Sequence, residues 1–160
     1  MGTKEHPKRI ESLTKNQLKE LNIEEVRGWT IECLLQIEYR INAKIVDYFK
    51  PIDKYKFNKI VLNSSIIDIG SKLKILMNID TVDPSIIEKI RKLAAIRNGF
   101  AHSSVTEKIN IKINKESDSS SIIVESIIEV MNSQGIIKSK IAYDYLVEFS
   151  TLYKEIMENI

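Results

Sequence analysis

The chain has 160 residues, of which 43% are apolar, and its 24 basic and 22 acidic side chains leave a net charge of +2. This length suits one domain with a core of its own, and the apolar content excludes a disordered chain. The nearly balanced charge excludes nucleic-acid binding through bulk charge, so that function would need a local basic patch. The single cysteine, Cys33, excludes an intramolecular disulfide, and its apolar helical surroundings predict a small core residue.

Residues 1–12 are polar and charged, and we expect them to form a flexible N-terminal arm ahead of one domain at residues 13–160. His6 lies in this arm with no second ligand close by, so we expect neither a metal site nor a cofactor. The charged start is not followed by the apolar segment of a secretory signal, and no apolar run approaches the length of a membrane span. We therefore expect a cytoplasmic protein without a membrane partner.

Two helices are predicted in the first third of the chain. Residues 14–21 can form a short helix with Thr14 as its N-cap and Gln17 at the capping-box position. Apolar residues recur every three or four positions over residues 23–49, which predicts one long helix that begins after Asn22. The aromatic residues of the long helix are predicted to pack rather than to stack on bases: Trp29, Tyr39, Tyr48 and Phe49.

Weaker helical patterns follow the long helix. Residues 53–62 continue the helical spacing weakly, and residues 63–65 indicate a break and an N-cap. Residues 66–77 then predict a further helix, in which Lys72 and Lys74 lie away from the apolar face.

The next predicted helix begins at a strong signal, because Asp83 supplies a capping carboxylate and Pro84 suits the first helical position. Its apolar stripe runs from Ile86 to Ala101. Arg97 lies within this stripe, at a position where an apolar residue would be expected if the whole face were core.

Beyond this helix the pattern changes. Residues 108–114 alternate apolar and polar side chains, which predicts a strand. Residues 122–131 suit a second strand, although their periodicity also permits a helix, and residues 136–141 suit a third. Residues 143–160 return to a helical pattern. The sequence thus predicts a mainly α chain, a helical bundle with a small antiparallel β-insertion at about residues 108–141. The lysines of this insertion suit either a basic face or the protection of exposed strand edges: Lys108, Lys112, Lys115, Lys138 and Lys140.

Arg97, Asn98 and His102 are the candidate catalytic residues. On one helix Asn98 and His102 share a face, whereas Arg97 and His102 point about 140° apart, so a second copy across a two-fold axis would be needed to bring both types together. An imidazole can take the proton of an RNA 2′-hydroxyl, and a guanidinium can hold the phosphate. Gly99, a poor helix former, indicates either the end of the helix or a close approach of another segment.

A structural interpretation stands beside this one, and the spacing alone favours it. A histidine at a helix C-terminus interacts well with the helix dipole and with unsatisfied carbonyls. An arginine in the last turns can pack its stem and expose its charged end. Under this interpretation His102 and Arg97 merely finish the helix.

The string IRNGFAH at residues 96–102 resembles the motif of the HEPN superfamily, in which an Arg and a polar residue, often Asn, are followed a few residues later by a His. The likeness covers residues 60–104 and is greatest to the branch that contains the mannitol operon repressor, where a helix similar to the segment Gly70 to Lys74 precedes the motif. The resemblance implies an up-and-down bundle of four to five helices, usually a homodimer, with the motif helix near the two-fold axis. The β-insertion is not part of that minimal bundle.

The resemblance implies two alternative functions. Catalytic members of the superfamily are metal-independent endoribonucleases, often toxins with an antitoxin partner or phage-defence effectors. Their active-site residues correspond to Arg97 and His102, with Asn98 as the supporting polar position. Members of the repressor-like branch are regulatory or partner-binding proteins. We expect an RNA-cleaving dimer, with a non-catalytic dimeric regulator as the alternative.

Overall fold

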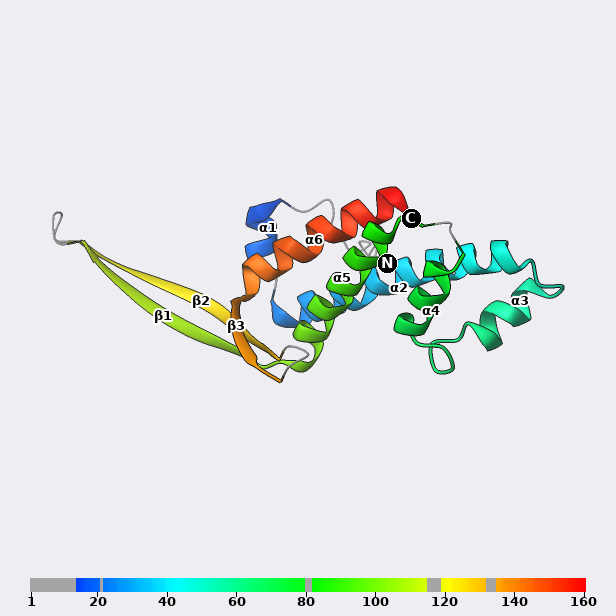
Figure 1. Cartoon of the computed structure of the whole chain (residues 1–160). Helices are drawn as coiled ribbons and strands as arrows, with labels where there is room; N and C mark the ends of the chain where they lie inside the picture. Colours follow the sequence, from blue (N-terminus) through cyan, green and yellow to red (C-terminus); the bar gives the residue numbers. More distant parts are fainter. Residues whose placement is uncertain (1–13, 21, 80–81, 115–118, 132–134) are drawn as a thin grey trace, which may run out of the picture.

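Helix α2 (Ile23–Phe49) is the element on which the other long helices pack (Figure 1). The computed structural model describes residues 14–20, 22–79, 82–114, 119–131 and 135–160. Within these residues the helices form a bundle, and a three-stranded antiparallel sheet precedes the last helix. The predicted mainly helical class with a β-insertion is therefore confirmed. The predictions for the arm at residues 1–12, including His6, lie outside the described residues.

The N-terminus of α2 carries both hydrogen bonds of a capping box. The Asn22 side chain accepts the Glu25 N–H at 2.8 Å, and the Glu25 carboxylate accepts the Asn22 N–H at 2.9 Å. Apolar spacings of three and four place one face of the helix in the core, where Cys33 is buried as predicted. Lys50 ends the helix in a left-handed conformation with φ of 44°. The predicted helix over residues 23–49 is confirmed.

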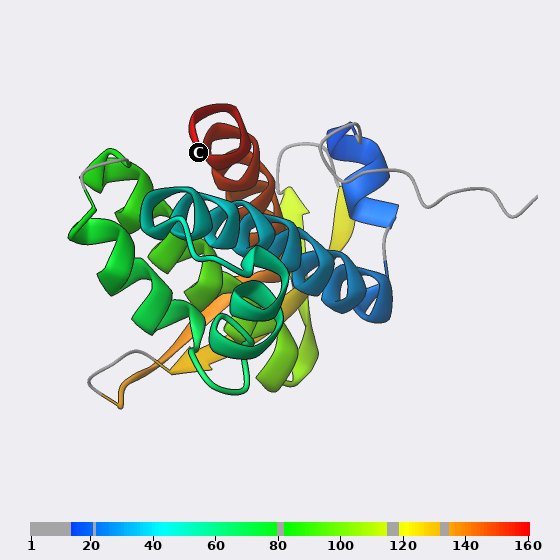
Figure 2. The same cartoon turned by 90° about the vertical axis from the view of Figure 1, so that its right-hand side faces the viewer.

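The other helices pack around α2, with α6 on one side of it and the α3–η2 segment on the other, except the short first helix, which packs on α6 (Figure 1 and Figure 2). They are α1 (Lys15–Glu20), α3 (Lys54–Lys56), the π-helical turn η2 (Phe57–Val61), α4 (Ile69–Met77), α5 (Pro84–His102) and α6 (Ala142–Asn159). The predicted cap of α1 is present, because the Gln17 N–H donates to Thr14 Oγ1 at 3.3 Å. The predicted helix over residues 53–62 is confirmed in type, but its π-helical turn was not expected.

Aspartates begin α4 and α5. The Asp68 carboxylate accepts the Ser71 N–H and the Asp83 carboxylate accepts the Ser85 N–H, each at 2.7 Å. These backbone hydrogen bonds favour the ionised carboxylates and lower the pKa of both aspartates below the usual value. The predicted start at Asp83 and Pro84 is confirmed.

Two predictions for the α4 region are wrong. The helix begins at Ile69 rather than at residue 66, because Asn63 holds a turn there: its carbonyl accepts the N–H groups of Ile66 and Ile67 at 2.8 and 2.9 Å. Lys72 is fully buried rather than on a solvent face. Its Nζ donates to Glu38 Oε1 of α2 at 2.5 Å, so a tertiary ion pair places the lysine in the core.

The sheet is made of β1 (Val105–Asn114), β2 (Ser119–Met131) and β3 (Ile137–Ile141), in the order β1-β2-β3. All three predicted strands are confirmed, and the open choice at residues 122–131 is settled as a strand. Ile128 of β2 is fully buried against the bundle. From this base the β1–β2 hairpin projects away from the helices (Figure 1). Of the lysines considered for a basic face, Lys138 and Lys140 are exposed, Lys115 lies outside the described residues, and only the backbone is described at Lys108 and Lys112.

The aromatic residues of α2 follow the prediction of packing only in part: Phe49 contacts the rings of Tyr48 and Phe57, but these residues are not core residues. Trp29 is partly buried, but Tyr39 is 70% exposed, and Tyr48 and Phe49 are also exposed. The core itself is aliphatic along α2 and receives its aromatic side chains from α5 and α6, among them Phe100 and Phe149. Within the described residues, no helix has both the length and the apolar character that crossing a membrane requires.

Candidate functional site

The candidate residues Arg97, Asn98 and His102 all lie on α5, which continues as an uninterrupted helix to His102. Asn98 and His102 are exposed, while Arg97 is half-buried. The Nε of Arg97 is buried and has no hydrogen-bond partner in the described part of the chain. Nor does any described residue pair with the side chain of Asn98 or His102. Among the described residues, therefore, no hydrogen bond or ion pair gives these three side chains a structural role.

The C-terminus of α5 is capped by Arg27 of α2. Its Nε donates to the Phe100 carbonyl at 2.9 Å, and its Nη2 donates to the Ser103 carbonyl at 3.1 Å. The last carbonyls of a helix have no partner within the helix, so a cation at this position satisfies them and also suits the helix dipole. The structural interpretation assigned this capping to His102, and the structure assigns it to Arg27.

The sequence did not point to Arg27, because it lies 73 residues from the nearer carbonyl that it caps. The available signal was an arginine at the edge of the apolar stripe of the long helix. That signal shows that the guanidinium sits near the core, but not which segment it contacts.

Gly99 allows another segment to approach α5 closely, which is one of the two explanations that the sequence offered. A Cβ at this position would lie 2.8 Å from Val130 Cγ1 of β2 and 3.1 Å from Tyr145 Cε1 of α6. The ring of Tyr145 also packs on Phe100, with 5.6 Å between the ring centroids. The glycine thus fixes the sheet base and α6 against the helix that carries the candidate residues.

Gly99→Ala is expected to destabilise the fold by about 1–3 kcal/mol, because β2 and α6 must shift to admit the methyl group. Urea unfolding measures this effect. Gly28→Ala is the matched control, since Gly28 is exposed on α2 and a Cβ there meets nothing within 4 Å. The control should stabilise the helix by up to about 1 kcal/mol. Equal effects of the two substitutions would contradict the packing role of Gly99.

The helix geometry decides which groups of one chain can act together. Asn98 and His102 are one turn apart on the same face, whereas five residues separate Arg97 from His102, which turns them about 140° apart. One chain therefore offers an imidazole and an amide on one face, and a guanidinium on a neighbouring face. Within the described residues there is no group of three His, Cys, Asp or Glu side chains that would hold a metal ion.

Comparison with family models, with curated proteins and with solved structures finds no match to this chain. The possible chemistry of the site is therefore inferred from its side chains alone. An imidazole can act as a general base or acid, and a guanidinium that no described carboxylate pairs with is suited to a phosphate oxygen. An amide one turn from the imidazole can orient either the ring or a bound phosphate.

Proposed function

We propose that this chain is a metal-independent endoribonuclease of the HEPN type that acts as a dimer, with Arg97, Asn98 and His102 as its active-site residues. The observation that carries the proposal is that a residue outside the motif caps the end of α5. Arg27 satisfies the helix carbonyls, and the three motif side chains have no described partner. The resemblance of residues 96–102 to the HEPN motif supplies the reaction class.

In the proposed reaction the imidazole of His102 takes the proton of a 2′-hydroxyl while the 2′ oxygen bonds to phosphorus. The bond from phosphorus to the 5′ oxygen breaks, and this oxygen receives a proton from a protonated imidazole. The products are a 2′,3′-cyclic phosphate and a 5′-hydroxyl, with no net consumption of protons or water. Arg97 stabilises the negative charge on the phosphate oxygens in the transition state.

A second copy of the chain completes the site in this proposal. Because Arg97 and His102 diverge on one helix, two α5 helices that pack across a two-fold axis would supply a guanidinium from one copy and an imidazole from the other. The second histidine would also serve as the proton donor to the leaving oxygen. Across the two-fold axis each copy contributes the same set of residues, as expected for an isologous dimer.

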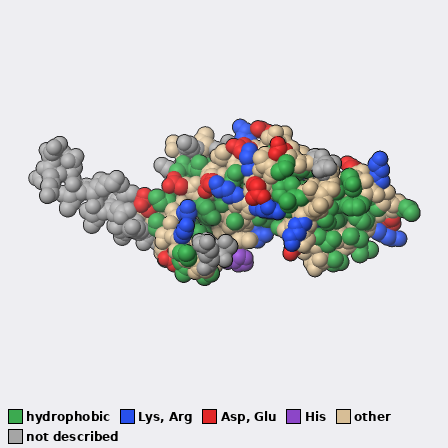
Figure 3. Space-filling view, viewed as in Figure 1, with side chains coloured by type: hydrophobic (Ala, Val, Ile, Leu, Met, Phe, Trp, Pro, Cys, Tyr) green, Lys and Arg blue, Asp and Glu red, His purple; other side chains and the backbone are tan. Residues whose placement is uncertain are grey.

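A non-catalytic dimeric regulator is the second candidate function, and the exposed apolar surface favours it. Hydrophobic side chains gather over the end of the molecule that carries α3 (Figure 3). Exposed hydrophobic residues in and beside the α3–η2 segment include Ile52, Tyr55, Ile60 and Ile66. Apolar surface of this kind is typical of a protein contact, and a regulator could use it while Arg97 and His102 bind a partner instead of cutting RNA.

Incubation of purified protein with a structured RNA in EDTA separates the two functions. For a metal-independent enzyme we expect the same rate of cleavage with EDTA as without it. The products should carry 2′,3′-cyclic phosphate and 5′-hydroxyl ends. Arg97→Ala should lower the rate by roughly 10²–10³-fold, as for loss of one transition-state donor. Arg91→Ala is the matched control, because Arg91 is exposed on the same helix and pairs with Glu88. A requirement for a divalent metal, or products with 3′-hydroxyl ends, would overturn the proposal.

A further inference from the structure

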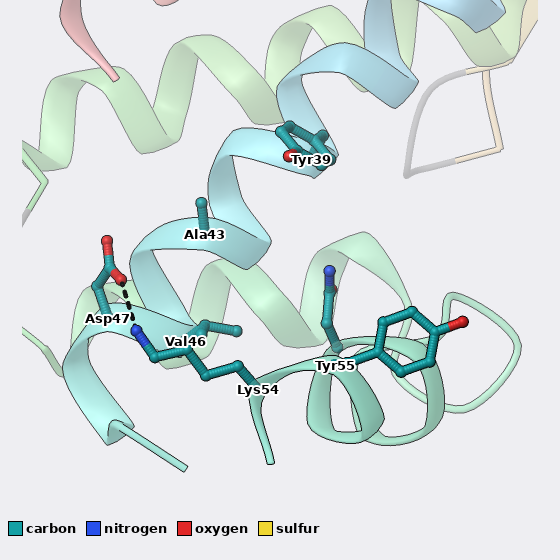
Figure 4. Close-up of a pocket in the computed structure, with 7 residues that line it drawn as sticks. Tyr39, Ala43, Val46, Asp47, Lys54 and Tyr55 are labelled. Atoms are coloured by element: carbon teal, nitrogen blue, oxygen red, sulfur yellow. Dashed lines mark ion pairs between the residues drawn. The ribbon is translucent and has the colours of Figure 1, made fainter. Parts of the chain in front are cut away.

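Two neighbouring hollows lie between α2 and the α3–η2 segment. Their volumes are about 260 and 300 Å³, and both are lined by Tyr39 and Asn58, which therefore stand on the ridge between them. In the smaller hollow, Tyr39 and Tyr55 lie on the rim, and the ion pair of Lys54 with Asp47 closes one end (Figure 4). We refer to the two hollows together as the Tyr39 groove.

The Tyr39 groove combines flat aromatic surface with neutral hydrogen-bonding groups. Tyr39 and Tyr55 are 70% and 73% exposed, although large apolar rings usually gain from burial. Asn42, Asn58 and Asn63 supply amides to the groove. Such a lining suits a flat heteroaromatic ring, which offers a face for stacking and an edge with donors and acceptors.

One polar side chain of the groove lining has a buried acceptor without a described partner. Asn42 lines the larger hollow, and its Oδ1 is buried and has no hydrogen-bond partner among the described residues. An unpaired buried acceptor is costly, so a donor from a ligand or from water is needed there. The neighbouring acceptor, Glu38 Oε1, already receives bonds from Lys72 Nζ and Ser64 Oγ. The free acceptor is therefore that of Asn42, and it matches the amino group or ring N–H of a nucleobase.

The backbone that forms the far wall of the groove is unusual. Phe57–Val61 is a π-helical turn, a rare structure that occurs frequently at functional sites. It carries Asn58 and Lys59 into the lining of the groove. Lys59 is exposed, and no described carboxylate pairs with it, so it is free to contact a phosphate beside a bound base.

We infer that the Tyr39 groove binds nucleobases of single-stranded RNA, which makes it a substrate subsite of the proposed ribonuclease and rests on that proposed function. Successive bases occupy the two hollows on either side of Tyr39, the amide of Asn42 accepts from a base edge, and Lys59 contacts the backbone. Recognition of this type targets unpaired bases, because the edges and faces of paired bases are not accessible.

The position of the groove relative to the motif helix supports this role. Arg27 fixes the end of α5 at the first turns of α2, and Tyr39 lies twelve residues further along α2, about 18 Å along the helix axis. Ile31 and Leu35 lie between them at four-residue spacing and are 45% and 53% exposed. Each four-residue step turns about 40° around the helix axis, so this exposed stripe winds around α2 from the end of α5 to the groove. A few unpaired nucleotides would span this stripe.

The test measures binding by fluorescence anisotropy with a single-stranded oligonucleotide that is fully 2′-deoxy-substituted and therefore cannot be cleaved in the proposed reaction. The probe has the sequence of a cleaved RNA, or a mixed sequence if no RNA is cleaved. Tyr39→Ala is expected to weaken binding roughly 5- to 150-fold, and Tyr39→Trp should retain it, since both aromatic residues stack on bases. The exposure of Tyr39 means that either variant should fold normally. Tyr48→Ala is the matched control, because Tyr48 is an exposed tyrosine of the same helix that lines a different hollow.

The outcomes separate this inference from the proposed function. In an active enzyme, Tyr39→Ala should raise KM with kcat little changed, whereas His102→Ala should lower kcat by roughly 10²–10⁴-fold and leave binding intact. Binding that depends on Tyr39 in a protein that cuts no RNA would support the subsite and overturn the nuclease. Cleavage and binding that are both unaffected by Tyr39→Ala would overturn the subsite alone. A change in oligomeric state with unaltered RNA binding would also overturn it, since the groove would then be a protein contact.

Discussion

His102→Ala is expected to lower RNA cleavage by roughly 10²–10⁴-fold, the contribution typical of a positioned general base or acid. The loss follows from the proposed proton transfers, in which the imidazole takes the 2′-hydroxyl proton and a protonated imidazole supplies the 5′ oxygen. The fold should be unaffected, because His102 is exposed and Arg27, rather than His102, bonds the last carbonyls of α5. The measurement is the single-turnover rate on a defined RNA, with far-UV circular dichroism and thermal unfolding of the same sample.

The control for this prediction is a substitution that disturbs the same helix end without touching the imidazole. Arg27→Ala removes both side-chain bonds to the carbonyls of Phe100 and Ser103, so it should lower the unfolding temperature more than His102→Ala does. It should also reduce cleavage less than His102→Ala. Undiminished cleavage by the His102→Ala protein would contradict the proposed proton transfers, whatever the role of Arg97.

Local sequence signals predicted the elements that depend on local interactions. The capping box at Asn22, the Asp83–Pro84 start and the strict alternation of residues 108–114 each act within a few residues, so the helices and strands they predict are present. The start of α4 was placed three residues early, because Asn63 and Asp68 are both plausible N-caps. Only the turn that Asn63 makes in the folded chain distinguishes them.

Predictions failed where a contact joins distant segments. Lys72 has the charge of a surface residue, and its burial depends on Glu38, 34 residues earlier. Arg27 likewise acts on carbonyls beyond residue 99. Helical periodicity gives the face on which such a residue lies but not the partner that neutralises it. The candidate site could be named from the sequence alone because Arg97, Asn98 and His102 lie on one helix and resemble a motif, and it stays a prediction. The Tyr39 groove was missed because it joins α2 to the π-helical turn.

The buried pair of Lys72 and Glu38 gives the prediction with the largest effect on stability. Glu38→Ala is expected to reduce the free energy of unfolding by about 3–5 kcal/mol, a large part of the total for a small domain. The Lys72 side chain is fully buried and that of Glu38 is 12% exposed, so the substitution leaves an ammonium group in the core without its carboxylate. Ser64 Oγ loses its acceptor as well. Urea unfolding, with the midpoint and the slope fitted separately, measures the change.

Glu148→Ala tests whether burial is the cause. Glu148 pairs with Lys92 at 2.5 Å, but the two side chains are 38% and 58% exposed, so loss of this pair should cost no more than about 1 kcal/mol. Replacing both partners, with Glu38→Leu and Lys72→Met together, should recover most of the stability lost in Glu38→Ala, because no charge remains buried. If Glu38→Ala were as mild as Glu148→Ala, the Lys72 ammonium group would have to reach solvent at little cost. The contact between α2 and α4 would then depend on apolar packing rather than on the ion pair.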